Sequence, residues 1–363
     1  MKYVVQRMID WVEERLFEGF SLVELSEKMG YSPYYCSFKF HQLTGVSLKR
    51  YMALRKIYLS SFALAKTNER ILDIALNHGY STQESYTRAF KEIFGISPNA
   101  YRQNPRPLQS YVKLTITTEE IYTMDISKKL RIEDLQNGIK EQFDADVLNI
   151  LNGEEMFKKF KEQQLMGASD YAPFNEAMCV NDVTYPIFSN EFNVMRAQGH
   201  KVTLQDYEAI TLAPLKGNLL FKKYSCIVLW FGEDMFCQMN LLTVLAYLEQ
   251  INYKGTVYYH AVQEQTYDVK ETIIQLGGYS SLYKEVLMEK NMPNKEMMPV
   301  MYQGIRLYME LQKEVNEITK YIKAHDQLTR YELVKSLLKV FPQYGLGDTQ
   351  YIEIINKVQG NES

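Results

Sequence analysis

The sequence has 363 residues, of which 46% are hydrophobic and 23% are charged. This composition is typical of a globular protein with two or three domains and excludes extended disorder. No apolar run approaches the roughly 18 residues that a membrane helix needs, and the N-terminus, with acids inside its apolar pattern, is a poor secretory signal. Four scattered cysteines without CxxC spacing exclude a disulfide scaffold and a cysteine-rich zinc site. We therefore expect a cytoplasmic protein that does not associate with membranes.

Charge divides the chain into a basic first third and an acidic remainder. Residues 1–107 contain 15 Lys and Arg against 10 Asp and Glu, whereas the other residues contain 26 against 34. This asymmetry is compatible with nucleic-acid binding by the basic part. On its own it is weak evidence, because many solvated helical domains reach the same net charge.

An internal repeat occupies the basic third. Gly30-Tyr31-Ser32 recurs as Gly79-Tyr80-Ser81, and Gly45-Val46-Ser47 recurs as Gly95-Ile96-Ser97. Each copy reads as helix, tight turn and helix, with a glycine that ends one helix and a serine that caps the next. A long helix from Leu48 to about Ala65 joins the copies. Such a helix spans about 27 Å, close to the roughly 34 Å between successive major grooves. Two helix-turn-helix units at this spacing predict a bipartite reader of DNA.

At these residues the chain resembles the AraC/XylS family of bacterial transcription regulators. The resemblance covers about residues 3–104 and rests on the pattern GYS–x8–F–x4–GxS, on the linker helix, and on ILDIALNHGYSTQESYTRAFKEIFGISPNAYR in the second copy. It implies an all-α double helix-turn-helix domain that binds double-stranded DNA. The family usually has this module at the C-terminus, whereas here it comes first and an effector domain would follow.

Two sets of residues are candidates for DNA contact. The resemblance implies base contacts at Tyr34, Ser37 and Phe38, and it matches Arg88 to a position used for bases or phosphates. Phe38 cannot make the bidentate contact to guanine that arginine makes, so we expect weak sequence reading by the first unit. The full set predicted to contact bases is Tyr34, Tyr35, Ser37, Phe38, Gln83, Ser85, Thr87 and Arg88. The set predicted to contact phosphates is Lys39, His41, Lys49, Arg50, Arg55 and Lys91.

The acidic two thirds have a different pattern. Pro105-Arg106-Pro107 marks a linker, and residues 111–117 alternate as a strand would. Residues 137–165 read as mostly helical. An apolar run from Ser225 to Phe231, a helix from Met235 to Glu249 and a strand from Gly255 to His260 form a βαβ pattern. We therefore predict an α/β domain over residues 108–280 and a helical C-terminal region over 281–363, after the DNA-binding domain of residues 1–107.

Polar residues near the predicted strand ends are candidates for a ligand pocket. They are Asn175, Glu176, Trp230, Glu233, Asp234, Gln238 and Asn240. Helix capping by Glu233 and Asp234 is an equally open interpretation. A divalent cation held by these oxygens is disfavoured, and no residue set predicts a cofactor or nucleophilic catalysis. Residues 140–358 also resemble an uncharacterised bacterial family with a WFGED-like strand end before a Leu-rich helix, from which no activity follows.

Three functions remain open. The favoured one is a DNA-binding transcription regulator, such as an activator, whose C-terminal part senses a small-molecule effector or mediates assembly with a second copy or RNA polymerase. The second is an enzyme linked to DNA, which requires Asn175, Glu176, Glu233 and Asp234 to converge in one pocket. The third is an assembly module without any pocket, which an exposed apolar patch would favour.

Overall fold

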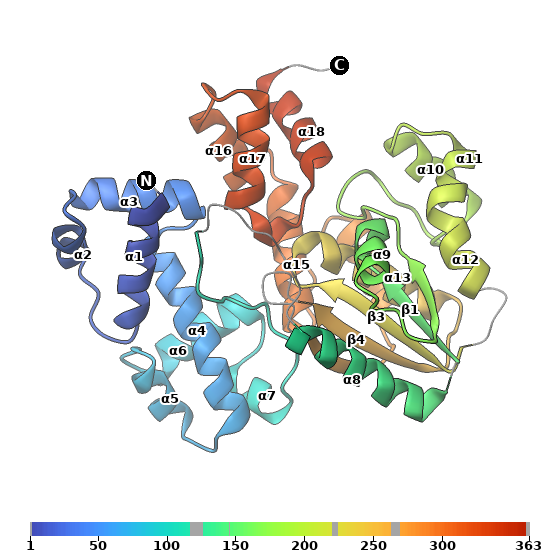
Figure 1. Ribbon diagram of the computed structural model, residues 1–363, viewed down its shortest axis with the longest axis horizontal. Coiled ribbons are helices and arrows are strands. Elements are labelled where there is room, and N and C mark those ends of the chain that lie inside the picture. Colours follow the sequence, from blue (N-terminus) through green and yellow to red (C-terminus); the bar gives the residue numbers. More distant parts are fainter. Residues whose placement is uncertain (1, 117–125, 145, 220–223, 263–268, 361–363) are drawn as a thin grey trace.

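The computed structural model describes residues 2–116, 126–144, 146–219, 224–262 and 269–360. Figure 1 shows a helical N-terminal region in blue and cyan on one side, and an α/β region with a central sheet on the other. The last helices, in red, stand between the two. The predicted multidomain layout, with a helical first part and a later sheet-containing part, is confirmed.

The N-terminal region consists of two helix-turn-helix units that share one long helix. Its helices are α1 (Lys2–Glu14), α2 (Leu22–Met29), α3 (Pro33–Thr44), α4 (Leu48–Lys66), α5 (Ile71–Asn77), α6 (Gln83–Phe94) and α7 (Pro98–Gln103). Ser32 and Ser47 cap α3 and α4 as their sequence context predicts, because each hydroxyl accepts a hydrogen bond from a backbone N–H three residues later. The 19 residues of α4 span about 28 Å.

Each unit has its own apolar core, and α4 contributes to both. Met52 of α4 packs in the first core with Phe40, and Ile57 packs in the second core with Phe90. Because one continuous helix enters both cores, the distance between the two units is fixed by the backbone of α4.

The α/β region is built on a five-stranded sheet of order β2-β1-β3-β4-β5. Its strands are β1 (Val147–Leu151), β2 (Asp170–Pro173), β3 (Cys226–Gly232), β4 (Thr256–Val262) and β5 (Val269–Ile274). The first four strands are parallel, and β5 pairs antiparallel with β4. The predicted βαβ unit is confirmed as β3, α13 (Met235–Gln250) and β4, with Cys226 opposite Thr256.

One sequence prediction about this region is wrong, and another is incomplete. Residues 111–116 form no strand. Their backbone groups bond instead to side chains of the helical units: Tyr111 accepts from Arg55, Leu114 donates to Tyr51, and Ile116 donates to Gln6. Residue 117 lies outside the described residues. Residues 137–165 are mostly helical, as predicted, through the end of the helix Ile126–Phe143 and the helix Gly153–Glu162, but they also contain the buried strand β1. All five residues of β1 are buried, so the strand has no polar alternation that would distinguish it from helix.

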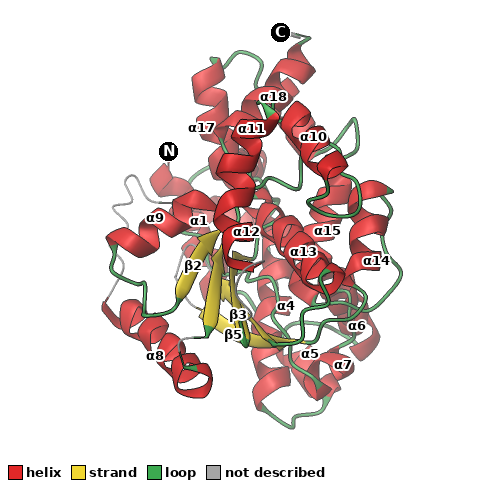
Figure 2. Cartoon of the chain, turned by 90° about the vertical axis from the view of Figure 1, so that its right-hand side faces the viewer, coloured by secondary structure: helices red, strands yellow, loops and turns green. Residues whose placement is uncertain are grey.

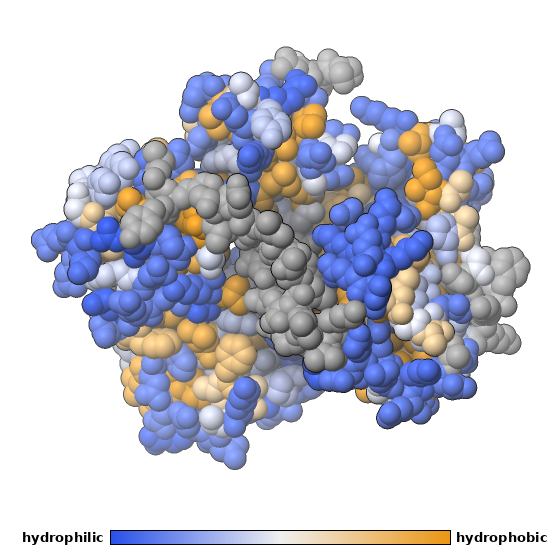
Figure 3. Space-filling model, in the orientation of Figure 1, coloured by the Kyte–Doolittle hydropathy of each residue, from blue (hydrophilic) through white to orange (hydrophobic). Residues whose placement is uncertain are grey.

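Helices cover both faces of the sheet, as Figure 2 shows. Alternate residues of β3 enter different cores: Val228 packs with Phe160 of α9 (Gly153–Glu162), and Leu229 packs on the opposite side with α13. The helix α8 (Ile126–Phe143) shares the α9 side, and α15 (Pro299–Leu311) packs on α13. Charged side chains cover the outer surface of α9 (Figure 3). The region is therefore a three-layer sandwich.

The C-terminal helices belong to this same body. The remaining elements are α10 (Asn190–Gly199), α11 (Leu204–Tyr207), η1 (Glu208–Leu212), α12 (Ala213–Leu219), α14 (Tyr279–Tyr283), η2 (Lys284–Met288), α16 (Glu317–Ala324), α17 (Arg330–Val340), η3 (Pro342–Tyr344) and α18 (Asp348–Gln359). One apolar core runs from Leu148 in β1 to Ile355 in α18. The boundary expected at residue 280 therefore does not separate two cores. None of the helices in the described ranges has both the length and the apolar character needed to cross a bilayer.

The N-terminal region docks on the C-terminal helices through the far ends of α3 and α6. The helix α3 packs against α17, and α6 packs against α15. Arg306 Nη1 donates a hydrogen bond of 2.6 Å to the carbonyl oxygen of Glu92. Gly95, which ends α6 with φ +76°, leaves no room for a side chain, since an added Cβ would lie 2.7 Å from the ring of Tyr302. Both helix-turn-helix units are thus held by one rigid partner.

Comparing Gly95→Ala with Gly30→Ala separates the cost of backbone strain from the cost of disturbing this docking contact. Gly30 is the matched control, because it has the same φ of +76° with nothing within 4 Å of an added Cβ. We expect Gly30→Ala to lower the free energy of unfolding by about 1–2 kcal/mol, the cost of the left-handed backbone. Gly95→Ala should cost a further 1–3 kcal/mol or so through the clash with Tyr302. Urea unfolding of both variants measures the difference, and equal costs would contradict the docked arrangement. In a Tyr302→Ala background the extra cost should disappear.

Candidate nucleic-acid interface

The second helices of the two units, α3 and α6, present equivalent outward faces. Cys36 and Phe40 of α3 are buried, as are Tyr86 and Phe90 at the corresponding positions of α6. Between them Phe38 and Arg88 are exposed, whereas Ala89 packs against the core of the second unit. Of the predicted base-contact residues, Tyr34, Phe38, Gln83 and Arg88 are exposed, and Tyr35, Ser37, Ser85 and Thr87 are half-buried.

The outward face of α3 is aromatic. Tyr34 is 79% exposed and stacks on Phe38, which is 48% exposed, with ring centroids 6.2 Å apart. Tyr31 stacks on Tyr35 with ring centroids 4.6 Å apart. Lys39 Nζ lies 5.2 Å from the ring of Phe38. Such a face has few hydrogen-bond donors for base edges, but it suits apolar contact with the methyl group of thymine.

The outward face of α6 is polar. Gln83 and Arg88 are exposed and suit the bidentate contacts that these side chains make with adenine and guanine, respectively. Ser85 is partly committed, since its hydroxyl donates to the carbonyl oxygen of Thr82 at 2.9 Å. The stronger hydrogen-bonding chemistry for reading base sequence therefore lies on the second unit.

Most of the predicted phosphate-contact residues lie at the surface. His41, Lys49 and Lys91 are exposed. Lys39 is half-buried and donates to Gln42 Oε1 at 2.8 Å. Arg50 is half-buried too, and it lies 3.6 Å from Glu92, so this ion pair links the start of α4 to the end of α6.

Arg55 does not belong to this set. It is 8% exposed, and its Nε and Nη2 each donate to Glu13 of α1 at 2.7 Å. Its Nη1 donates to the carbonyl oxygen of Tyr111 at 2.5 Å. Burial opposes ionisation of Glu13, but the hydrogen bonds from Arg55 and Tyr51 outweigh it and lower the pKa of that carboxyl. Arg55 is a buried link between α1, α4 and the segment that leads to the sheet, and it cannot reach a phosphate.

Glu176 does not line a pocket either, because it forms a buried ion pair. Its carboxylate accepts hydrogen bonds from Arg196 at 3.0 and 2.5 Å and from the hydroxyl of Tyr207 at 2.8 Å, and both charged side chains are inaccessible to solvent. Burial alone would raise the pKa of Glu176, but Arg196 and His200 hold it at about 2. The amide of the neighbouring Asn175 donates to the carbonyl oxygen of Ile210 at 3.0 Å.

Three further pocket candidates are interior residues with partners of their own. Trp230 faces α9, and its Nε1 donates to Asn149 Oδ1 at 2.9 Å. Gln238 Nε2 donates to the carbonyl oxygen of Gly232 at 2.6 Å. Asn240 is fully buried and donates to the carbonyl oxygen of Glu176 at 2.7 Å. The pocket assignment of these residues is corrected by their burial and their hydrogen bonds.

The two acids after β3 have different partners. Asp234 caps α13, since its Oδ1 accepts a hydrogen bond from the N–H of Cys237 at 2.9 Å, as the capping interpretation predicts. Glu233 instead accepts hydrogen bonds from the N–H and hydroxyl of Ser110, at 2.8 and 3.0 Å. The four residues of the enzyme hypothesis therefore do not line one cavity: Glu233 and Asp234 line the larger cavity described below, whereas Asn175 and Glu176 are not among its lining residues, and the Glu176 carboxylate is buried against Arg196. No group of three or more His, Cys, Asp or Glu that could hold a metal is found among the described residues.

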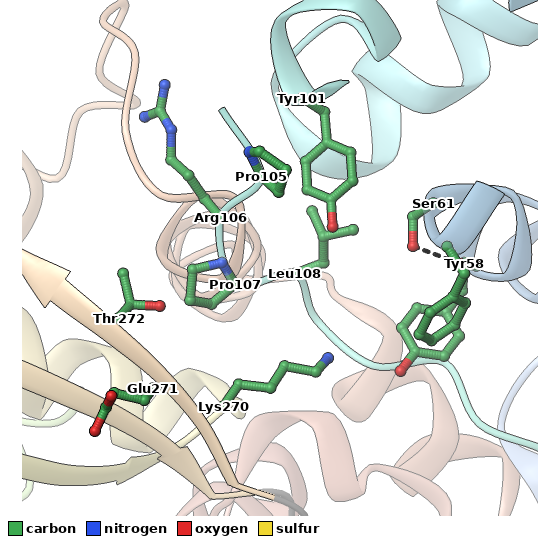
Figure 4. A pocket seen from close by; sticks show the side chains of 11 residues that line it. Tyr58, Ser61, Tyr101, Pro105, Arg106, Pro107, Leu108, Lys270, Glu271 and Thr272 are labelled. Atoms are coloured by element: carbon green, nitrogen blue, oxygen red, sulfur yellow. Dashed lines mark hydrogen bonds between the residues drawn. The ribbon is translucent and has the colours of Figure 1, made fainter. Parts of the chain in front are cut away.

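Two cavities lie where the N-terminal region meets the rest of the chain. The larger has a volume of about 780 Å³, and its walls include Glu233 and Asp234 together with residues of α4, α15 and the segment 109–114. The smaller has about 190 Å³; Figure 4 shows Leu108 between Tyr101 on one side and Lys270 of β5 on the other. Of the residues predicted to line a pocket, Glu233 and Asp234 line the larger cavity. The other walls were not predicted, because they come from segments that are far apart in the chain.

Comparisons with known proteins concern the helical N-terminal region. A family model described as a helix-turn-helix domain matches residues 25–104. The TetD protein of transposon Tn10 from Escherichia coli is 35% identical over 101 residues, which are 28% of this chain and 73% of that protein. The multiple antibiotic resistance protein MarA of Escherichia coli K12 is 36% identical over 98 residues, 27% of this chain and 77% of MarA.

One further relative and two solved structures are also similar to the N-terminal region. The right origin-binding protein of Escherichia coli K12 is 31% identical over 131 residues, and the match spans 36% of this chain and 45% of that protein. Among solved structures, an AraC-type regulator from Chromobacterium violaceum has 20% identity and a TM-score of 0.27, with 29% of this chain and 96% of that chain covered. The DNA-binding domain of AdpA in complex with a target DNA has 21% identity and a TM-score of 0.26, with 27% and 89% covered.

The buried ion pair of Glu176 predicts a specific pH dependence of stability. Its pKa is about 2 in the folded state against 4.5 as the ordinary value, so its contribution is complete above pH 4.5 and is lost as the pH falls toward 2. We expect Glu176→Gln to lower the free energy of unfolding by about 3–5 kcal/mol at pH 7. The difference from the wild type should shrink steadily between about pH 5 and pH 3.

Urea unfolding at several pH values measures this difference. Glu208→Gln is the control, because Glu208 is exposed on the adjoining helical segment. It should change stability by less than about 0.5 kcal/mol at every pH. A constant difference for Glu176→Gln across the acidic range would mean that the carboxylate is not the charged partner of Arg196.

Proposed function

Because the chain belongs to the AraC family of helix-turn-helix DNA-binding transcription regulators, we propose that it recognises one bipartite DNA site through α3 and α6. The observation that carries this proposal is the pair of equivalent outward faces on these two helices, whose separation is fixed by α4. One chain then reads two successive major grooves on one side of the duplex.

The two units divide the reading of the site. Arg88 and Gln83 of α6 supply hydrogen bonds to base edges, so this unit selects a defined half-element. Tyr34 and Phe38 of α3 supply apolar contact, which favours thymine at the other half-element and discriminates less strongly. Binding is strengthened by Lys49, Lys91 and His41 at the phosphates, and this contribution weakens as salt is added.

The C-terminal region adjusts this binding in response to a signal. It contacts the far ends of α3 and α6 and leaves their outward faces exposed. A molecule that alters this docking alters the placement of one unit relative to the other, and thereby the affinity for DNA. A second copy of the chain or RNA polymerase would meet surfaces outside these contacts.

Selection of bound sites from a random duplex library by the full chain tests the proposed function. We expect a motif with two half-elements about 10 base pairs apart, of which the one contacted by α6 is more sharply defined. Recovery of unrelated sequences, with affinity that depends on salt alone, would overturn the proposal.

Substitutions on α6 separate base reading from phosphate contact. Arg88→Ala should weaken binding to the selected site by about 10- to 100-fold and relax the preference at one base pair. Lys91→Ala should weaken binding to all duplexes alike. It should also reduce the slope of log affinity against log salt concentration by about one. Lys323→Ala, at an exposed position of α16, is the control and should change neither quantity. Fluorescence anisotropy at several salt concentrations measures all three variants, and a loss for Arg88→Ala that is independent of sequence would contradict its role.

A further inference from the structure

We infer that the cavity of about 780 Å³ between the two regions binds an uncharged, mainly apolar small molecule that carries one amide or hydroxyl group. The inference rests on the proposed function, because it supplies the site at which a signal reaches the DNA-binding units. The site lies between the N-terminal region and the α/β body, and among the predicted pocket residues it includes Glu233 and Asp234.

The position of the cavity in the fold is one that ligands use. Glu233 and Asp234 directly follow β3, and Val262 ends β4, so one wall is the carboxyl edge of the parallel strands. Ligands of parallel α/β sheets bind beyond this edge. The volume also lies within the range of about 300–1,000 Å³ that small-molecule sites occupy.

Two glutamine side chains in the walls each have an unpartnered polar atom, which a polar group on the ligand could bond. Gln109 and Gln303 are 8% and 6% exposed, and both line the cavity. Among the described residues, Gln109 Oε1 and Gln303 Nε2 have no hydrogen-bond partner. A buried polar atom without a partner is costly, so such atoms are usually satisfied by something that binds. Gln109 Oε1 is an acceptor and Gln303 Nε2 is a donor, so an amide or hydroxyl group satisfies both.

Several charged side chains around the cavity already have partners within the protein, and Arg306 donates to the carbonyl oxygen of Glu92. Ser110 donates to Glu233, Arg55 is held by Glu13, and Lys313 is held by Glu310. A charged ligand would have to break such a pair or remain uncompensated, so an uncharged molecule is favoured. The other walls are largely apolar, and the contributing residues are Val46, Leu54, Leu114, Val262, Met292, Leu307 and Met309. The two methionines can adapt to the shape of the ligand.

A ligand in this cavity touches both helix-turn-helix units, directly or through one neighbour. Thr44 and Val46 join α3 to α4 and line the cavity. Arg306 of α15 also lines it and donates a hydrogen bond to Glu92 at the end of α6. Occupancy of the cavity therefore favours one docked arrangement of α3 and α6, and DNA affinity follows from that preference.

The test uses benzanilide, an uncharged two-ring amide, as the probe. Binding to the full chain is followed by ligand-observed NMR, with 4-carboxybenzanilide as its charged counterpart. We expect saturable binding of benzanilide and at least tenfold weaker binding of the carboxylate. Gln303→Leu should weaken benzanilide binding about tenfold, because one hydrogen bond is lost. The variant should still fold, since an apolar side chain replaces a polar one that lacks a partner at Nε2. Gln205→Leu, at an exposed position of α11, is the matched control and should bind like the wild type.

Three results would overturn the inference: no saturable binding of benzanilide, a preference for the carboxylate, or equal binding by Gln303→Leu and the wild type. The same proteins are titrated with the selected DNA duplex. Saturating benzanilide should change the affinity of the wild type for this duplex at least about fivefold and leave Gln303→Leu unchanged. An unchanged affinity of the wild type would overturn the regulatory part. If the wild type and Gln303→Leu bind the duplex equally but benzanilide does not bind, the cavity is not the ligand site. The proposed function in DNA recognition then stands. If the wild type selects no duplex, the proposed function itself fails.

Discussion

The ion pair between Arg55 and Glu13 connects the parts of this molecule that must keep a fixed geometry. Glu13 lies on α1 and Arg55 on α4, so the pair holds the first unit to the helix that sets the spacing of both units. The same guanidinium holds the backbone of Tyr111, and the adjoining Ser110 binds Glu233 at the end of β3. A continuous path of charge-assisted hydrogen bonds therefore runs from the first unit to the edge of the sheet.

This path explains why the segment after the second unit is not a simple tether. Pro105-Arg106-Pro107 indicates a stiff linker, and residues 105–116 have no helix or strand. Their backbone groups are nevertheless used: Pro107 accepts a hydrogen bond from the N–H of Val300, at 3.2 Å, and Tyr111 accepts one from Arg55. A segment without regular structure that is bound on both sides transmits a displacement, whereas a free linker would absorb it.

The parts of the fold that follow from local patterns were predictable from the sequence. Ser32 and Ser47 cap helices, and Cys36 and Phe40 are buried, because capping and amphipathic spacing depend on neighbours within a few residues. The strand β1 was missed because it is buried on both faces. Arg55 was misassigned because its exposure depends on Glu13, 42 residues away. Glu176 and Arg196 likewise form a pair that only the tertiary fold brings together.

The location of the candidate ligand site also depends on contacts between segments that are distant in the sequence. The order of the strands places a crevice where β1 and β3 end, and the acids after β3 lie there as the sequence suggested. The protein fills that crevice itself: Asn152 binds Cys237 and Asn240, and the turn at Gly345 approaches Asp234 so closely that a Cβ would not fit. The space that remains lies beyond β3 and β4, against α4 and α15. A molecule that uses the carboxyl edge of this sheet must therefore also touch the DNA-binding units, and in this fold binding at the sheet and control of DNA contact become one event.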